Sequence, residues 1–359
     1  MIKVRGRMKM KKILPVKSPI DFIAYKPFDA SRIAILLAQE TLCKELYENF
    51  IHFRIEKLCE KGMIELDCHF NEEFSSVGVK KVPIDVLFDL HIEFIDFCKK
   101  SIDREFYLFI PIETSEISNY SVYKEKKVPH HIFVYGYDDE KQVFKCSEFF
   151  SFSSAQYSFE EVSYQEMKNA FLDLQQQTNE KMMENEWAQW LKDIQLLHCF
   201  KEYKDRFTIE RVRIALQNYL DEKDCYGNKG YIKDVYYGFA IYDLTEEYID
   251  QISKKDRDSF DIRCFSLILF HFHYLRLQAE FIKQNYEDTK KGMQTFIDEF
   301  NKIEKDSKEL RSLAIKYRLT HEKGILNRIK IKLQKTKEKE MEILIKYINY
   351  LKYIEKEAG

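Results

Sequence analysis

Glycine and proline are scarce in this chain of 359 residues: ten glycines and six prolines occur, and every proline lies before residue 130. Because both residues interrupt helices, their scarcity in the second half favours long helices there. Long apolar runs are also missing. No stretch of about 18 apolar residues occurs, so we expect no membrane span. The basic start of the chain lacks the apolar core of a secretory signal.

Paired cysteines and an excess of one charge are missing as well. The eight cysteines form no CxxC pair, which excludes zinc-knuckle and redox spacings. The net charge is −2, whereas a general nucleic-acid-binding protein usually carries a basic excess. The sequence contains no glycine-rich phosphate loop, no HExxH and no GxSxG motif. We therefore expect a cytoplasmic protein without cofactor or metal, which binds neither nucleic acid nor a membrane.

The composition that remains is that of a soluble globular protein. Hydrophobic residues make up 45% of the chain and charged residues 33%, so a sizeable core and a soluble surface can both form. The patterns along the chain predict a disordered tail at residues 1–12, an α+β domain at residues 13–178 and a helical domain at residues 179–359.

The predicted α+β domain starts with an edge strand at residues 13–20, which two prolines interrupt. A central helix begins near Ala30, with Asp29 or Ser31 as its cap, and the apolar pattern continues to residue 58. We expect an amphipathic helix at residues 83–100. Further strands are predicted at residues 62–74, 105–112 and 157–162.

The last helix of this domain and those of the next one carry start signals. Ser163 and Glu166 have the spacing of a capping box, and Thr208 is placed to begin a later helix. Other helices are predicted at residues 186–200, 239–254, 261–285 and 287–319. The charged residues 323–356 are typical of a helical hairpin or a partner-binding arm.

Residues 128–150 form the centre of the predicted α+β domain. HHIFVY has the composition of a buried strand, and QVFKCSEFF is its returning partner. Between them we expect a turn at residues 136–140, in which Gly136 takes a positive φ and Asp138 and Asp139 bond to their own backbone.

Two side chains of this hairpin are candidates for general base catalysis. His130 stands at the head of the first strand, and Glu148 at the end of the second is placed to orient it. The alternatives are a histidine bonded to a loop carbonyl and a solvated charge. His131 points to the opposite face because side chains alternate along a strand. His271 and His273 are two residues apart on a helix, so we do not expect them to share a metal ion.

The nucleophile that such a base would activate is missing. A papain-like thiol sits at the N-terminus of the central helix, where backbone amides lower its pKa. The segment here is YKPFDASRI, which contains no cysteine, and Ser31 is its only hydroxyl. Cys43 lies about three turns too far along the helix.

With these residues in place, the chain resembles the butirosin-biosynthesis acyltransferase N-terminal-like proteins. These are relatives of the papain-like peptidases that process bacteriocin leaders, and they occur in nonribosomal and other thiotemplated biosynthesis clusters. The resemblance extends from about residue 13 onward. It rests on ILPVKSPI, FDASRIAILLAQE, HHIFVYGYDDEKQVF, FTIERVRIALQNYL, VYYGFAIYDLTEEYID and FDIRCFSLILFHFHYLRLQ.

The resemblance implies a papain-like cysteine-peptidase-type α+β domain followed by an all-helical C-terminal region. It implies Cys-His-Asp acyl transfer, in which an acyl group leaves a carrier-protein thioester, rests on cysteine and passes to an amine. The partners it implies are a phosphopantetheinyl acyl or peptidyl carrier protein and an amine acceptor. A homodimer through the C-terminal helices is a further expectation.

Carried over by position, the family histidine falls on His130 and the aspartate on Glu148, and the missing cysteine falls between Pro27 and Ala30. Three interpretations remain open. The protein is a pseudoenzyme that binds an acylated carrier, or Ser31 has taken the nucleophile's role, or Ala30 replaces a cysteine. A leader peptidase is disfavoured because no transporter segment accompanies the domain.

Overall fold

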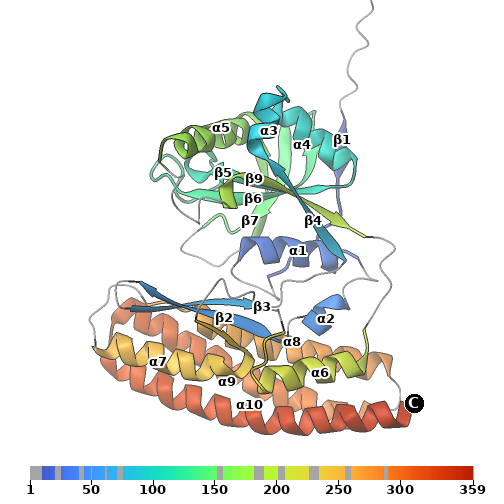
Figure 1. Cartoon of the computed structure of the whole chain (residues 1–359), viewed down its shortest axis with the longest axis vertical. Helices are drawn as coiled ribbons and strands as arrows, with labels where there is room; N and C mark the ends of the chain where they lie inside the picture. The colour runs from blue at the N-terminus through green and yellow to red at the C-terminus, as the bar shows by residue number, and fades with distance from the viewer. Residues whose placement is uncertain are drawn as a thin grey trace, which may run out of the picture. The chain divides into compact units, whose positions relative to one another are not determined.

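The computed structural model describes residues 10–20, 26–39, 44–49, 51–60, 63–70, 76–151, 157–181, 190–200, 207–225, 234–254, 260–286 and 290–358. Contacts divide the chain into two compact units. The sheet unit comprises residues 1–43 and 74–204, and the helical unit comprises residues 44–73 and 205–359. Figure 1 shows the elements of both.

A seven-stranded antiparallel sheet forms the core of the sheet unit. Six strands lie in the order β4-β9-β5-β6-β7-β8, and β1 pairs with β6. Its strands are β1 (Lys11–Ile13), β4 (Val77–Pro83), β5 (Tyr107–Glu113), β6 (Pro129–Asp138), β7 (Val143–Glu148), β8 (Ser158–Ser163) and β9 (Asp193–Cys199).

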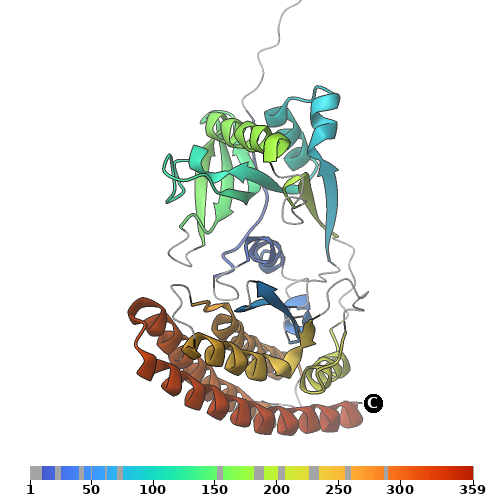
Figure 2. The same ribbon diagram turned by 60° about the vertical axis from the view of Figure 1, so that its left-hand side comes forward.

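Helices cover both faces of this sheet. On one face lies α1 (Pro27–Leu37), whose Phe28 ring contacts the Phe109 ring of β5 at 5.2 Å. On the other face lie α4 (Phe94–Asp103) and α5 (Tyr164–Lys181), whose Phe94 and Phe171 rings stack at 4.1 Å. The sheet is visible between α1 and these two helices in Figures 1 and 2. The short α3 (Ile84–Asp89) and the 3₁₀ turn η1 (Thr114–Glu116) complete the unit.

The helical unit contains six helices and a small antiparallel sheet of order β10-β2-β3 among its described residues. The three longest helices, α8, α9 and α10, pack side by side (Figure 1). The elements are α2 (Glu45–Asn49), β2 (Phe53–Glu60), β3 (Met63–Phe70), α6 (Ile209–Leu220), β10 (Val235–Tyr237), η3 (Gly238–Ala240), α7 (Ile241–Lys254), α8 (Arg263–Asn285), α9 (Lys290–Thr320) and α10 (Lys323–Ala358). None of the described helices has the length and apolar character that a bilayer crossing requires.

Several sequence predictions are confirmed. The chain is mixed α+β with a helix-rich C-terminal region, and residues 128–150 contain the hairpin β6–β7. The capping box forms, because the Glu166 N–H donates to Ser163 Oγ at 3.1 Å and the Ser163 N–H donates to Glu166 Oε2 at 3.2 Å. Thr208 caps α6 through the Arg211 N–H.

Other predictions are wrong in instructive ways. The region beyond residue 178 is not all helical, since residues 193–199 form β9 between β4 and β5. Residues 53–58, predicted as part of the central helix, belong to β2. The helix expected at residues 83–100 is two helices, because His91 takes a positive φ and Glu93 caps α4 by accepting from the Ile95 N–H.

The predicted tail and turn also differ from the structure. Residues 1–9 lie outside the described part of the chain, but Lys11 and Lys12 belong to β1. Gly136 lies within β6, and its hydrogen is needed for the close approach of β1: a Cβ there would stand 2.8 Å from the Lys12 carbonyl oxygen. The positive φ falls on Gln142 instead. Asp138 does shape the turn, since its Oδ1 accepts from the Glu140 N–H at 3.0 Å.

Candidate functional site around the start of helix α1

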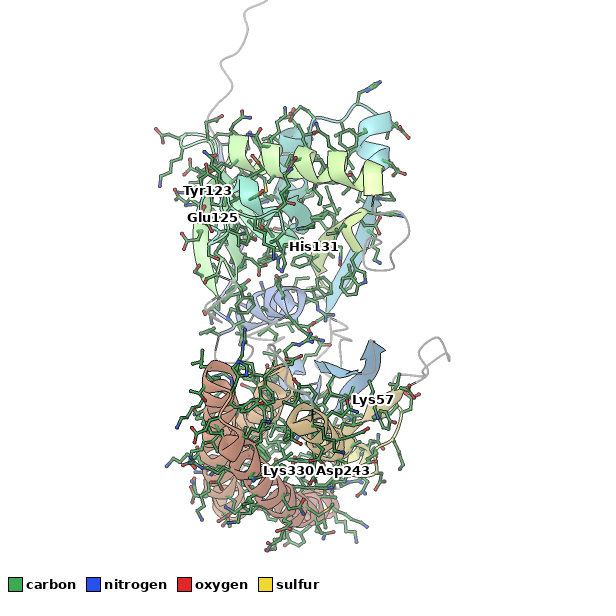
Figure 3. All side chains as sticks on the ribbon, turned by 90° about the vertical axis from the view of Figure 1, so that its left-hand side faces the viewer. Lys57, Tyr123, Glu125, His131, Asp243 and Lys330 are labelled. Carbon is green, nitrogen blue, oxygen red and sulfur yellow. The ribbon has the colours of Figure 1, made fainter. Side chains whose placement is uncertain are left out.

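His131, and not His130, lies on the face of the sheet that α1 covers. The His131 ring stacks on Phe109 with a centroid distance of 4.7 Å and an interplanar angle of 4°. Phe109 in turn contacts Phe28 in the first turn of α1. His131 therefore lies on the side of the sheet where the resemblance would place a catalytic base (Figure 3).

His130 lies on the opposite face. Side chains alternate along a strand, so His130 shares its face with Ile132 and Val134. Val134 pairs with Cys146 on β7, and Phe144 on the same face of β7 contacts Tyr164 of α5 at 4.7 Å. The predicted position of His130 over Ala30 is therefore wrong, because that face belongs to α4 and α5.

Glu148 does not orient His130. Its Oε1 accepts from the Phe149 N–H at 2.7 Å, and its Oε2 has no hydrogen-bond partner in the described structure. Burial raises the pKa of Glu148 well above its ordinary value, and the hydrogen bond from the Phe149 N–H opposes this shift. His130 Nδ1 lies 3.0 Å from the carbonyl oxygen of His131, and burial lowers the pKa of His130. This contact matches the alternative of a histidine bonded to a backbone carbonyl.

The first turn of α1 is partly exposed at Pro27 and Phe28 and buried from Asp29 onward. Lys26 precedes the helix with a φ of 62°, and Pro27 occupies the first helical position, where a missing N–H costs nothing. Neither predicted cap acts as one, since no side chain caps this helix. Ala30 and Ser31 are both fully buried. A nucleophile at either position would be shielded from a macromolecular substrate.

The Ser31 hydroxyl is held by groups that cannot act as a base. Its Oγ donates to the Pro27 carbonyl at 2.7 Å, and it interacts with the Tyr157 hydroxyl. The Tyr157 hydroxyl also lies 2.8 Å from Ser147 Oγ. Burial raises the pKa of Tyr157, so this phenol stays protonated. Ser31, Tyr157 and Ser147 therefore form a chain of neutral hydroxyls, which we call the hydroxyl cluster.

Asp29 has a structural role beside this cluster. Its Oδ1 lies 2.5 Å from Arg32 Nη2, and both side chains are buried. The Arg32 guanidinium also lies 4.6 Å from the Phe28 ring centre. The acid in the first turn of α1 is thus already neutralised by a neighbouring cation and is not available as a general base.

His131 itself is a weak base. Its Nε2 lies 3.0 Å from the Trp190 carbonyl oxygen, so the neutral ring carries its proton on Nε2 and donates there. Burial, and then repulsion from His130, lower the pKa of His131 to about 3. The imidazole is neutral near physiological pH, but a base of this strength accepts protons poorly.

Sequence reasoning missed two members of this region and chose the wrong residue of the pair His130 and His131. Ser147 and Tyr157 carry no motif, and only the fold brings Tyr157, which directly precedes β8, to both Ser147 of β7 and Ser31. His130, and not His131, was predicted to face the start of the helix. The alternation of β6 was available from the sequence, whereas the side on which α1 packs was not.

No metal centre is built into the described residues. They contain no group of three or more histidine, cysteine, aspartate or glutamate side chains that could hold an ion. The two histidines of α8 contact different acids, as their spacing predicts: His271 Nε2 lies 2.9 Å from Glu340, and His273 Nδ1 lies 3.3 Å from Glu304.

Comparison with known proteins leaves the family open. No family model matches the chain, and no curated protein matches it at a significant level.

Proposed function

We propose that this protein is a catalytically silent binding module, related in fold to papain-like acyltransferases, that docks a carrier protein or another partner of a thiotemplated assembly line. The start of α1 carries the proposal. It offers no cysteine, its only hydroxyl is buried in the hydroxyl cluster, and no hydrogen bond joins His130 to Glu148, whose Oε1 accepts from the Phe149 N–H and whose Oε2 has no partner in the described structure. Nucleophilic catalysis requires a base within hydrogen-bond reach of the nucleophile.

We place the docking surface for such a partner on α10. Arg328, Ile331 and Lys335 are spaced by three and four residues and so share one helix face. All three are exposed, and Ile331 exposes 60% of its surface. Neither Arg328 nor Lys335 forms an ion pair within the described part of the chain. An exposed apolar residue between two uncompensated cations suits an acidic partner helix.

Calorimetry with a purified, phosphopantetheinylated carrier protein from the same gene cluster tests this proposal. We expect binding that His130→Ala leaves unchanged and that the double charge reversal Arg328→Glu, Lys335→Glu weakens at least tenfold. Lys346→Ala on the same helix is the control, because this lysine pairs only with Glu342. Equal binding by all variants would contradict docking through α10, and loss of binding in a folded His130→Ala variant would contradict docking that does not involve His130.

A second candidate is acyl transfer from a thioester to an amine, as the resemblance implies for active relatives. One observation favours it: His131 faces α1, where Ala30 occupies the position that corresponds to the family cysteine. In this case Ala30→Cys would restore a thiol on the histidine side of the sheet. Formation of an acyl adduct on that thiol separates the two candidates.

A further inference from the structure

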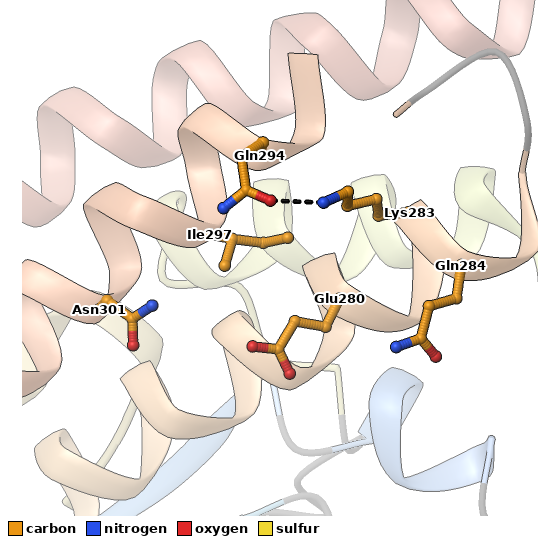
Figure 4. A pocket seen from close by; sticks show the side chains of 6 residues that line it. All are labelled: Glu280, Lys283, Gln284, Gln294, Ile297 and Asn301. Carbon is orange, nitrogen blue, oxygen red and sulfur yellow. Dashed lines mark hydrogen bonds between the residues drawn. The ribbon is translucent and has the colours of Figure 1, made fainter. Parts of the chain in front are cut away.

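A pocket of about 570 Å³ opens between the last turns of α8 and the start of α9, within the helical unit (Figure 4). Ile297 contributes a buried apolar surface. The other lining side chains are polar: Glu280, Lys283, Gln284, Gln294 and Asn301. A volume of this size falls in the range of small-molecule sites, which combine an apolar surface with a few polar groups.

The two charged side chains of this pocket do not neutralise each other. Glu280 and Lys283 are three residues apart, a spacing at which opposite charges on a helix can pair. Instead, Glu280 Oε1 accepts from Arg276 Nη1 at 2.7 Å, and Lys283 Nζ donates to Gln294 Oε1 at 2.5 Å. An ammonium has three donors and a carboxylate about four acceptor sites, so each group keeps capacity for a ligand.

The amides of the lining add neutral hydrogen-bonding groups. The side chains of Gln284 and Asn301 make no hydrogen bond to the described residues. Each amide offers both a carbonyl acceptor and an NH₂ donor. Gln294 is already committed, because its Nε2 donates to Asp298 at 2.8 Å and its Oε1 accepts from Lys283.

From this arrangement we infer that the pocket binds a small zwitterion of the aliphatic α-amino acid class. The ligand carboxylate bonds to Lys283, its ammonium bonds to Glu280, and its aliphatic side chain covers Ile297. The two charged residues lie one helical turn apart, with about 5–6 Å between their Cβ atoms, and can close on a ligand whose opposite charges are a few ångströms apart. This site lies wholly in the helical unit and does not depend on the function proposed above.

Titration calorimetry of the full chain with L-leucine tests the inference. We expect one site with a Kd on the order of 1 mM, in keeping with a ligand of this size. The charge-deleted analogues isoamylamine and 4-methylpentanoate, which lack the carboxylate and the ammonium respectively, should each bind at least tenfold more weakly than leucine.

Three substitutions assign the contacts. Lys283→Gln should weaken leucine at least tenfold and leave isoamylamine unchanged, and Glu280→Gln should weaken leucine and leave 4-methylpentanoate unchanged. Lys302→Gln is the matched control, since this exposed lysine of α9 pairs with Glu299 and does not line the pocket. Far-ultraviolet circular dichroism confirms folding of each variant. No saturable binding of leucine up to about 10 mM, or equal affinity in wild type and Lys283→Gln, would overturn the inference.

Discussion

A fully buried pair of ionisable groups joins α8 to α10 in the core of the helical unit. This pair makes the stability of the helical unit sensitive to single substitutions. His271 of α8 and Glu340 of α10 have no exposed surface, and Nε2 of the histidine lies 2.9 Å from Oε1 of the glutamate. The second oxygen, Oε2, accepts from the Tyr242 hydroxyl of α7. Tyr219 of α6 stacks on the imidazole with a centroid distance of 4.5 Å. Four helices therefore meet at this pair.

Removing one member leaves the other buried without its partner. Breaking a buried pair in this way costs roughly 3–5 kcal/mol, whereas replacing both members with apolar side chains of similar volume is often neutral or stabilising. We predict that His271→Leu and Glu340→Met each destabilise the helical unit by about 3–5 kcal/mol. The double variant should recover at least about 2 kcal/mol of the summed loss, since neither ionisable group then remains and only the Tyr242 hydroxyl loses its acceptor.

Urea unfolding separates this effect from changes elsewhere. Far-ultraviolet circular dichroism reports mainly on the long helices α8, α9 and α10. Both tryptophans, Trp187 and Trp190, fall within residues 74–204 of the sheet unit, so tryptophan fluorescence does not report on these helices. The midpoint of the dichroism transition should shift in the single variants. Strictly additive losses in the double variant, or losses below about 1 kcal/mol in both single variants, would refute the coupling of His271 to Glu340.

Three further predictions concern the sheet unit. Burial raises the pKa of Glu148 in the folded state, so the wild type loses stability as the pH rises above the ordinary pKa of 4.5. In urea titrations at increasing pH, the unfolding free energy of Glu148→Gln should therefore gain up to about 1.4 kcal/mol per pH unit relative to wild type. The pKa of His131 is lowered from 6.5 to about 3, so the unfolded chain binds more protons between these pH values, and stability falls as the pH decreases through this interval. His131→Gln should remove about 1.4 kcal/mol per pH unit of this loss. Parallel plots of stability against pH for wild type and variant would exclude the buried neutral imidazole. Gly136→Ala should lower the unfolding free energy by roughly 1–3 kcal/mol because the new Cβ would meet the Lys12 carbonyl oxygen. Gly324→Ala is the control and should be neutral or stabilising, because its Cβ would lie 3.9 Å from Glu322 Oε1.

The sequence was a good guide where a signal is local. The scarcity of glycine and proline correctly indicated the long helices α8, α9 and α10. The spacing of Ser163 and Glu166 gave a capping box, and the alternation of residues 128–150 gave a hairpin. In each of these cases the deciding contacts join residues that are close in the chain.

The sequence was a poor guide where distant contacts decide. The segment FRIEKLCE continues an apolar helical pattern, yet pairing with β3 and β10 makes it strand β2. Residues 193–199 lie within a stretch that was predicted to be helical, yet they form β9 between β4 and β5. Tertiary partners override local preference in both cases.

The candidate site shows the same division. The alternation of His130 and His131 was predicted, but a strand pattern does not state which of its faces meets α1. Nor does the sequence show that Ser31 meets Tyr157, since these two residues lie more than a hundred positions apart. The absence of a cysteine near Ala30 was evident from the start.

The proposal of a catalytically silent helix start is tested most directly by intact-mass spectrometry of wild type and Ala30→Cys after incubation with a phosphopantetheinyl acyl thioester. Cys225 is exposed in both proteins and gives the same background acylation. We predict equal adduct levels, because position 30 is fully buried and His131 is a weak base. An additional adduct that maps to position 30 and disappears in the double variant Ala30→Cys, His131→Ala would contradict the proposal and establish the acyltransferase alternative.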